Sequence, residues 1–308
     1  MAERIPPSGH VDPQEDVIYE FTPEMDARWT VTPGTSVTIH TIDSLIGEVE
    51  SEGDLLHEVP EEVNAATGPI AIDGASPGDV LRVRIDDVHV PEAIGRVTVL
   101  PGFGLHHDHD ALEAPRTRIA DVGDASVRFE GLDFPLEPMI GTIGVAPREG
   151  SYTTIVPHDH GGNLDTTDVR AGSTIYFPVF QPGALLGLGD SKAVMGDGEV
   201  SGTGAEVATD VDVTLDLIED PPIALDRPLI ETAEAWKTVA SGESLEEACR
   251  LANEDLIRLV EREHGLDFTD AYMATSLAAD LEISQVVDPL VTVRNAIPKA
   301  SLSNPFAG

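Results

Sequence analysis

Residues 157–168, PHDHGGNLDTTD, gather histidine, asparagine and aspartate side chains around two adjacent glycines. Adjacent glycines allow positive φ angles and a close approach of the backbone to a ligand. Histidine, asparagine and aspartate side chains bind metals and orient small polar substrates. Asparagine, aspartate and glycine are also ordinary turn residues, so the segment taken alone reads as the tip of a hairpin. Its role depends on the rest of the chain.

A second candidate is the glycine-rich stretch at residues 188–206, LGDSKAVMGDGEVSGTGAE. It holds four acidic residues that the glycines could bring close together: Asp190, Asp197, Glu199 and Glu206. Carboxylates in a cleft can bind a cation or act as a general base. A solvated loop is the alternative, because acidic residues are frequent throughout this chain. The acids interrupt an otherwise apolar run between Leu185 and Val200, and that position favours a site.

Residues 104–113, GLHHDHDALE, have the composition of a metal site, with His106, His107 and His109. Neighbouring side chains on an extended segment point to opposite faces, so only His107 and His109 could share a metal. A flexible exposed loop is the favoured interpretation of this segment.

Other catalytic classes lack their motifs. The chain contains no G-x-S-x-G, and Cys249 lies within an amphipathic helical pattern, where it reads as a core residue. The segment GALLGLGDS lacks the GK[ST] ending of a phosphate loop. Nucleophilic serine, nucleophilic cysteine and nucleotide chemistry are thus disfavoured, and metal- or carboxylate-assisted hydrolysis remains.

The charge of the chain is strongly negative. Its 308 residues include 56 Asp and Glu against 18 Lys and Arg, a formal net charge of −38, while 41% of the residues are hydrophobic. The acids are spread along the whole chain instead of forming a tail. A uniform acidic surface repels itself at low salt and is screened at high salt, so we interpret it as halophilic adaptation to molar intracellular salt. With no basic patch, nucleic acid is not an expected partner.

No feature indicates export or a membrane. The N-terminus, MAERIPPSGHVDPQED, has no apolar h-region. The most apolar stretch, residues 173–189, is interrupted by prolines, Gln181 and glycines, so it is not expected to span a bilayer. Cys249 is the single cysteine, which excludes an internal disulfide. These observations predict a soluble, cytoplasmic protein.

The elements that must carry the candidate residues are mostly strands. Residues 34–42 alternate, and residues 207–217 place Val207, Val211 and Leu215 inward and aspartates outward, which is typical of a half-buried antiparallel strand. Glycine and proline clusters recur about every ten residues, as in a sandwich or barrel.

The pattern changes after residue 228. Residues 244–265 predict a helix, with a capping box from Ser244 to Glu247 and Gly265 at its end. A second helix is expected at 268–281 and a final strand at 290–295. Because no linker accompanies the change, we predict one domain over 1–308, with a β-rich part, 1–228, and a C-terminal α/β part, 229–308, packed on it.

Five segments in order resemble the acetamidase/formamidase family: residues 64–81, 138–147, 160–166, 183–206 and 277–289. The resemblance spans nearly the whole chain. It implies a mainly β fold of interlocked jelly-roll-like sandwich and β-barrel-like parts with a small C-terminal α/β element. It also implies an amidohydrolase that cleaves short-chain amides, such as formamide and acetamide, to a carboxylic acid and ammonia.

Because of the resemblance, we interpret residues 157–168 as part of the site and no longer only as a turn. We expect this segment to face the 188–206 stretch. We expect a divalent metal ion, zinc first and calcium or magnesium as alternatives, to polarise the carbonyl and activate water. The expected metal ligands are His160, Asp165, Asp190 and Asp43. The expected catalytic residues are Glu199 as the proton carrier, Asp190, and Asn163, which would orient the amide.

One residue of the second stretch differs from the family's pattern. Where the family commonly has histidine two residues after the aspartate of the second stretch, this chain has Lys192, and an ammonium repels a metal cation. We expect Lys192 to pair with Asp190 or Glu199, because burying these carboxylates unpaired would be costly. The alternatives are a non-catalytic jelly-roll protein that binds a small polar ligand and a hydrolase for cyclic or urea-like amides. A homodimer is the expected assembly.

Overall fold

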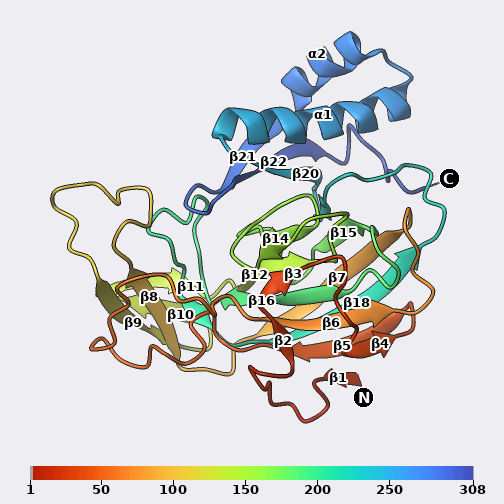
Figure 1. The fold of residues 1–308 in the computed structure, drawn as a ribbon. Helices are drawn as coiled ribbons and strands as arrows, with labels where there is room; N and C mark the ends of the chain where they lie inside the picture. Colours follow the sequence, from red (N-terminus) through yellow and green to blue (C-terminus); the bar gives the residue numbers. More distant parts are fainter. Residues whose placement is uncertain (1–2, 308) are drawn as a thin grey trace.

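The computed structural model describes residues 3–307, and in this range strands dominate and two helices lie near the C-terminal end (Figure 1). The prediction of a mainly β protein with a small C-terminal helical element is confirmed. None of the helices in this range is both long and apolar enough to cross a membrane.

The first sheet has nine strands. Their spatial order is β1 (Glu3–Ile5), β5 (Thr35–His40), β18 (Asp210–Ile218), β7 (Val80–His89), β15 (Thr174–Pro178), β19 (Leu229–Glu231), β20 (Ala235–Gly242), β22 (Val291–Pro298) and β21 (Asp280–Gln285). Strands β19 to β22 continue the sheet built by earlier strands, so the C-terminal part shares its hydrogen-bonded ladder with the β-rich part.

The second sheet has eleven strands. Eight follow in the order β11 (Leu132–Pro135), β10 (Ser126–Phe129), β9 (Arg116–Val122), β8 (Ile94–Val99), β17 (Glu206–Val207), β16 (Leu186–Lys192), β12 (Met139–Gly144) and β14 (Gly161–Asn163). β6 (Ala66–Ile72) pairs with β16 and also with β2 (Val17–Ile18) and β4 (Trp29–Val31). A separate ribbon joins β3 (Glu20–Phe21) to β13 (Tyr152–Thr153).

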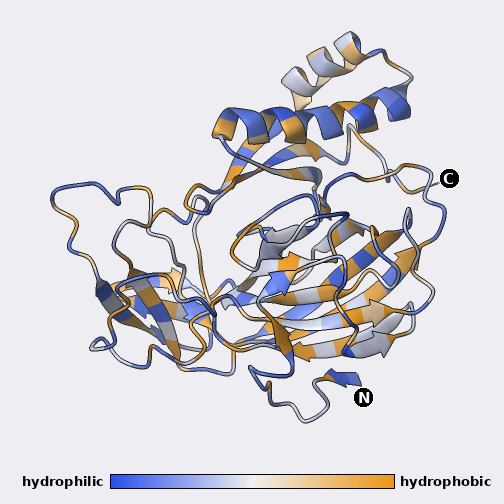
Figure 2. Ribbon diagram, viewed as in Figure 1, coloured by the Kyte–Doolittle hydropathy of each residue, from blue (hydrophilic) through white to orange (hydrophobic). Residues whose placement is uncertain are grey.

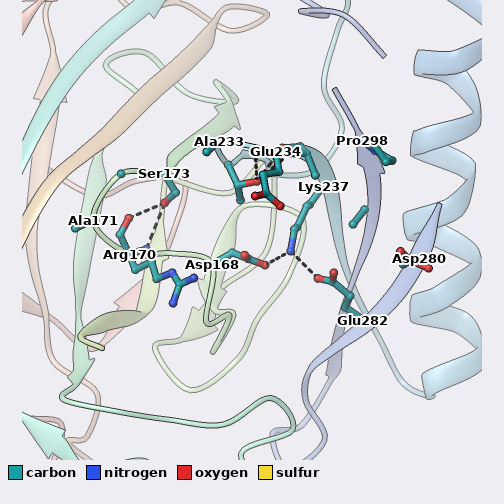
Figure 3. Close-up of a pocket in the computed structure, with 14 residues that line it drawn as sticks. Asp168, Arg170, Ala171, Ser173, Ala233, Glu234, Lys237, Asp280, Glu282 and Pro298 are labelled. Atoms are coloured by element: carbon teal, nitrogen blue, oxygen red, sulfur yellow. Dashed lines mark hydrogen bonds and ion pairs between the residues drawn. The ribbon is translucent and has the colours of Figure 1, made fainter. Parts of the chain in front are cut away.

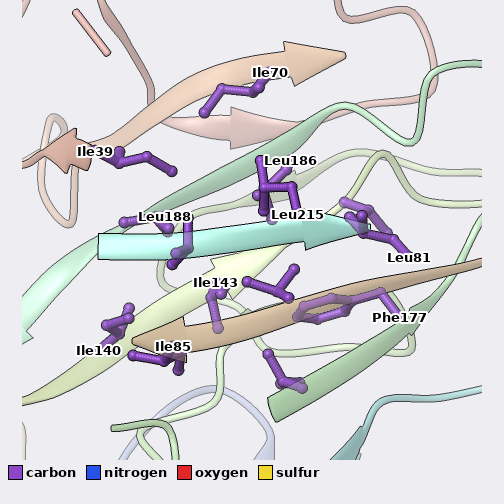
Figure 4. Packing of buried hydrophobic residues seen from close by; sticks show 14 of the residues in the cluster. Ile39, Ile70, Leu81, Ile85, Ile140, Ile143, Phe177, Leu186, Leu188 and Leu215 are labelled. Carbon is purple, nitrogen blue, oxygen red and sulfur yellow. The ribbon is translucent and has the colours of Figure 1, made fainter. Parts of the chain in front are cut away.

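The apolar faces of the two sheets meet in the largest core cluster (Figure 4). Leu81 and Ile85 on β7 and Leu215 on β18 come from the first sheet, and Ile143 on β12 and Leu188 on β16 come from the second. All five side chains are fully buried. Burial of a side chain of this size contributes about 1.5–3 kcal/mol, so this interface holds the two sheets together.

The strand expected at 207–217 is divided between the sheets. Val207 belongs to β17 in the second sheet, whereas β18 begins at Asp210 in the first sheet. Buried Thr209 lies at the crossing and donates a hydrogen bond to Ser191 Oγ on β16, at 2.7 Å. The alternation of buried and more exposed residues continues through the crossing, so the sequence pattern did not reveal it.

The predicted first helix is confirmed as α1 (Leu245–His264). The Ser244 hydroxyl accepts a hydrogen bond from the Glu247 N–H, and Gly265 ends the helix in the left-handed conformation. The Glu247 carboxylate accepts from the Glu243 N–H, one residue before the expected capping-box partner. Figure 2 shows hydrophilic and hydrophobic residues alternating along α1, whose buried residues pack on β20 and β22.

The second helix, α2 (Phe268–Ala278), is shorter than expected. Asp267 caps its start, and the chain becomes extended at Ala279. Residues 280–285 then form the edge strand β21, which the sequence analysis did not predict. The expected last strand, 290–295, lies within β22.

Candidate active site

A buried lysine lies at the centre of five acidic side chains. Lys192 ends β16, and its Nζ contacts Asp165 Oδ1 and lies 2.8 Å from Asp190 Oδ2 and 3.4 Å from Glu199 Oε1. Glu206 Oε1 is 4.0 Å away, and Asp288 completes the group through its interaction with Asp165. We call Lys192 and these five acids the carboxylate cluster. The predicted ion pairing of Lys192 with Asp190 or Glu199 is confirmed.

The backbone around the cluster is shaped to bring these groups together. Asp190 and Lys192 are two residues apart on β16 and therefore point to the same face. A Cβ atom placed on Gly141, in the neighbouring strand β12, would lie 2.5 Å from Asp165 Oδ1, Asp190 Oδ2 and Lys192 Nζ. Only glycine leaves room here for the three side chains to meet.

Three of the acids have backbone angles that side-chain-bearing residues seldom adopt. The φ angles are +42° at Asp165, +53° at Asp190 and +43° at Glu199. Such strained positions cost on the order of 1–3 kcal/mol each and gather at functional sites. Their concentration in one cluster therefore favours a functional role over a structural one.

Amide and hydroxyl groups surround the acids. Asn163 donates from Nδ2 to Asp288 Oδ2 at 3.0 Å, and its Oδ1 accepts from the Thr142 hydroxyl at 2.6 Å. Asn64 donates to Asp190 Oδ2 at 3.2 Å, and the Ser44 hydroxyl donates to Glu206 at 2.9 Å. These contacts fix the orientation of the carboxyl groups.

Burial keeps protons on the cluster. It raises the pKa values of Asp190, Glu199 and Asp288 well above the ordinary range for carboxyl groups, and neighbouring acids add to the shift. Burial acts in the opposite direction on Lys192, but the surrounding carboxylates outweigh it and raise the pKa of the ammonium well above its ordinary value. A permanently charged lysine thus lies beside acids that can hold or release a proton.

A small cavity opens against the cluster. Its volume is about 50 Å³. The cluster acids, Asn64 and Asn163 line its polar side, and its apolar side is formed by Leu45, Val63, Leu100, Phe103 and Ile155. A Cβ atom on Gly202 would come within 2.5 Å of the Phe103 ring, so glycine at 202 allows that ring its position. The cavity suits a polar molecule of a few heavy atoms.

His160, an expected metal ligand, lies outside the cavity. Its ring packs between Phe21, with ring centroids 5.0 Å apart, and Tyr152, at 5.1 Å. Both ring nitrogens are buried without a hydrogen-bond partner, and burial lowers the pKa of the imidazole to about 3. The backbone turns between His160 and Asn163, where Gly161 and Gly162 have φ angles of +102° and +86°, and of these two predicted residues only Asn163 lines the cavity. His160 therefore serves as a neutral packing group here.

Asp43 is also outside the cavity. Its carboxylate accepts hydrogen bonds from the backbone N–H groups of Leu45 and Gly47, both at 3.0 Å, and lies 3.7 Å from Arg96 Nε. These contacts stabilise a turn, and the turn places Ser44 against Glu206. Asp43 thus acts through the position of its neighbour.

The four expected metal ligands do not form a ligand set. Within residues 3–307, no three or more His, Cys, Asp or Glu side chains are arranged to hold a metal ion. The Lys192 ammonium occupies the point where Asp165, Asp190 and Glu199 converge, and a protonated amine cannot coordinate a cation. The donor set fits an ammonium group and does not fit a divalent metal.

The expected site residues Asn163, Asp165, Asp190 and Glu199 do come together at the cavity. Sequence reasoning named Glu206 only as one of the acids of the 188–206 stretch, and it left out Asn64, Ser44 and Asp288. Asn64, Glu206 and Asp288 could have been predicted as site residues, because they fall in segments that carry the family resemblance. The His106, His107 and His109 loop is exposed, as the favoured interpretation predicted, although Leu100 and Phe103 just before it line the cavity.

A larger hollow of about 670 Å³ lies beside β20, β21 and β22 (Figure 3). Lys237 crosses it and lies 2.8 Å from both Asp168 and Glu282. Next to it, the fully buried Arg294 pairs with Asp168 at 2.7 Å and Asp197 at 2.5 Å. Its cations are already paired, so this hollow is not a stronger candidate than the small cavity.

Arg294 nevertheless connects to the cluster through the chain. Asp168 is three residues after Asp165, and Asp197 is two residues before Glu199. The 197–199 loop is further held by the Gly198 N–H, which donates to the Ser284 carbonyl on β21 at 2.8 Å. The C-terminal strands thereby hold both loops that supply cluster acids.

Comparisons with known proteins agree with this architecture. The model of the acetamidase/formamidase family matches residues 7–152 and 148–303. The chain is 26% identical over 261 residues to a formamidase of Methylophilus methylotrophus, covering 64% of this chain and 63% of that protein. It is 27% identical over 262 residues to an acetamidase of Mycolicibacterium smegmatis, covering 64% of each. The chain thus spans just under two thirds of the length of these curated relatives.

Solved structures match over nearly the whole chain. A predicted acetamidase/formamidase of Thermoanaerobacter tengcongensis is 38% identical with a TM-score of 0.88, covering 94% of each chain. An acetamidase of Bacillus halodurans is 34% identical with a TM-score of 0.87, covering 93% of this chain and 96% of that one. A γ-lactamase of Delftia acidovorans, 21% identical with a TM-score of 0.69, covers all of this chain and 95% of its own, and shares the fold.

Proposed function

The chain belongs to the acetamidase/formamidase family, and from this we propose that it hydrolyses short-chain amides to a carboxylic acid and ammonia. The observation that carries the proposal is the carboxylate cluster against a cavity of about 50 Å³. The cavity has room for formamide or acetamide, and its polar side offers hydrogen-bond donors and acceptors for both ends of an amide group.

An amide resists hydrolysis because its carbonyl is weakly electrophilic and its nitrogen is a poor leaving group. An enzyme must polarise the oxygen, activate water and protonate the nitrogen. The Lys192 ammonium, held by Asp165 and Asp190, is the charge that would stabilise the developing oxyanion. Its contact with Glu199, at 3.4 Å, is longer than that with Asp190, so a substrate oxygen could replace it.

Glu199 is the proposed proton carrier. As a carboxylate it would take a proton from the attacking water, and as an acid it would return that proton to the leaving nitrogen. Burial raises the pKa of the Glu199 carboxyl, which favours its holding the proton between the two steps. The Asn163 side chain, fixed between Thr142 and Asp288, would orient the amide. No step passes through a metal ion, since the donor set does not fit one.

Ammonia release tests the proposal. Formamide, acetamide, a small lactam and urea are supplied to the purified protein in 3 M KCl, with Asn163→Leu as a matched variant of similar volume. We expect release from the linear amides and strong loss in the variant. Release only from the lactam or urea would favour the cyclic or urea-like substrate class. No release from any of them, together with tight binding of acetamide, would favour the non-catalytic ligand-binding protein.

We propose that the protein acts in a cytoplasm of high salt and as a homodimer. The net charge of −38 supports the first. An exposed apolar surface on α2 and β21 supports the second, and its members are Phe268, Tyr272, Met273, Leu277 and Leu281. Asp270 is the single charged residue of α2, whereas β21 adds the exposed Asp280, and molar salt would screen the repulsion between these acids on two copies. Sedimentation of the Leu277→Asp variant, which should be monomeric, tests the assembly.

A further inference from the structure

Another hollow, separate from the one beside Lys237, lies on the other side of Glu199 from the small cavity. Its volume is about 270 Å³, more than five times that of the cavity. Glu199 and Thr203 line both spaces and therefore form the wall between them. The mechanism proposed above uses the small cavity alone and gives this hollow no role. We call it the apolar cleft.

The cleft is built from one face of the sheet that β8 to β11 form and from the loop that carries Glu199. Its main apolar members are Val97, Val127, Phe129, Phe134, Val194 and Val200. Phe134 is 39% exposed and Val200 is 53% exposed, so apolar side chains meet water here on a chain with a net charge of −38. An open apolar cleft with few polar groups binds hydrocarbon more readily than it binds a polar molecule.

We propose that the apolar cleft receives the alkyl chain of an amide substrate whose amide group lies in the small cavity. This inference rests on the proposed function and names its substrate class, primary amides with a medium-length alkyl chain. The carbonyl oxygen faces Lys192, and the chain passes between Glu199 and Thr203 into the cleft. Glu199 stands at the junction, and moving its carboxyl away from Lys192 opens the passage.

The side chain of Glu199 is the part that would move. Its backbone is held, because Asp197 pairs with Arg294 and the Gly198 N–H donates to the Ser284 carbonyl. The Glu199 carboxyl has a longer contact with Lys192, 3.4 Å, than that of Asp190, 2.8 Å. Displacing it therefore disturbs the cluster less than displacing Asp190 would.

Chain length is the variable that tests the inference. Straight-chain primary amides from formamide to octanamide are compared by kcat/KM in 3 M KCl. Each methylene buried in the cleft should raise kcat/KM roughly threefold to fourfold until the cleft is full. If kcat/KM falls steadily for chains longer than that of acetamide while acetamide is still cleaved, the apolar cleft does not bind the alkyl chain, and the proposed function stands. Failure to cleave any amide overturns both.

Phe134→Asp tests the location of the chain, with Leu132→Asp as its control. Both residues lie on β11 and are exposed, but Leu132 does not line the cleft. We expect Phe134→Asp to lower kcat/KM for hexanamide about tenfold and to leave acetamide unchanged, while the control changes neither. Equal losses on both amides, or a changed oligomeric mass with an unchanged chain-length profile, would overturn the inference. Phe134→Ala, which removes the ring without adding charge, should give a smaller loss of the same kind.

Discussion

Lys192 Nζ lies 3.4 Å from Glu199 Oε1, although the two side chains come from a strand and a glycine-rich loop. This contact joins the group proposed to stabilise the oxyanion to the group proposed to carry the proton. Asp165 and Asp190 bind the same ammonium from its other sides. The position of Lys192 therefore controls both the charge and the proton transfer of the site.

Replacement of Lys192 by methionine should abolish most of the activity. We expect kcat for acetamide to fall by a factor on the order of 10² to 10³, because the donor to the developing oxyanion is lost. Lys299→Met is the control, since Lys299 is partly exposed and pairs with Glu231 away from the cavity. Thermal melts at pH 6 verify that both variants fold. Full activity of Lys192→Met would contradict the assigned role.

Replacement of Lys192 by histidine should create a metal site. A neutral imidazole can coordinate zinc, whereas an ammonium cannot, and Asp165 and Asp190 already converge on this position. We expect the zinc content of Lys192→His to approach one ion per chain and its amide turnover to depend on added metal. The parent and Lys192→Met provide the baseline. If Lys192→His and the parent have the same zinc content and full activity, the replacement of the family's histidine by lysine at position 192 has no consequence for the site.

Arg294 is expected to act on catalysis through the loops that it binds. Arg294→Met would remove the ion pairs of Arg294 with Asp168 and Asp197 and leave Asp168 paired with Lys237 alone, so kcat should fall about 10- to 100-fold while KM changes less. The pH dependence of kcat should also shift, because the 197–199 loop sets the surroundings of Glu199. Arg294→Lys should recover part of the loss, and Arg82→Met, which breaks a surface pair with Asp216, should have no effect. An unchanged pH profile would indicate a purely structural role.

Much of the fold could be predicted from the sequence because its signals are local. The Ser244 cap, the left-handed Gly265 and the buried alternation of Val211, Val213 and Leu215 each depend on neighbouring residues. The division of 207–217 between two sheets is not local. Alternation fixes which face is buried, but it does not say which sheet supplies the partner.

The candidate site was predictable where its members lie in one segment. The pairing of Lys192 with Asp190 follows from their separation of two residues on a strand. Asp288 lies 125 residues from Asn163, and tertiary packing alone brings them to 3.0 Å. His160 lies outside the cavity because the backbone turns at Gly161 and Gly162, whose φ angles are +102° and +86°, and residue spacing alone does not show this turn.

Low salt should destabilise the protein. Acidic groups spread over the surface repel one another, and the Debye length shortens from about 10 Å at 0.1 M salt to about 3 Å at 1 M. We expect the midpoint of thermal unfolding to rise by at least 10 °C, as an order of magnitude, between 0.1 M and 3 M KCl. NaCl serves as a control for the identity of the cation. Coincident melts would refute halophilic adaptation.

The stability of the folded protein should decrease as the pH rises from 5 to 9 in 3 M KCl, where surface repulsion is screened. Burial raises the pKa values of Asp190, Glu199 and Asp288 in the folded state. In the unfolded chain these carboxyls ionise near pH 4. Between the ordinary and the raised values, the folded protein holds protons that the unfolded chain has lost. Unfolding then releases protons, and the free energy of unfolding falls by about 1.4 kcal/mol per pH unit for each proton.

Deprotonation of Lys192 lowers the free energy of unfolding further at higher pH. Its pKa is raised in the folded state, so its stabilisation is complete below the ordinary value of 10.5 and is lost as the pH rises through the folded value. In Lys192→Met the carboxyl pKa values should rise further, because the ammonium that lowers them is gone, and the decline should extend to higher pH. Denaturant unfolding of both proteins at each pH measures this difference. A flat profile in the parent would show that the buried acids ionise as they do in water, and the proposed proton exchange at Glu199 would lose its basis.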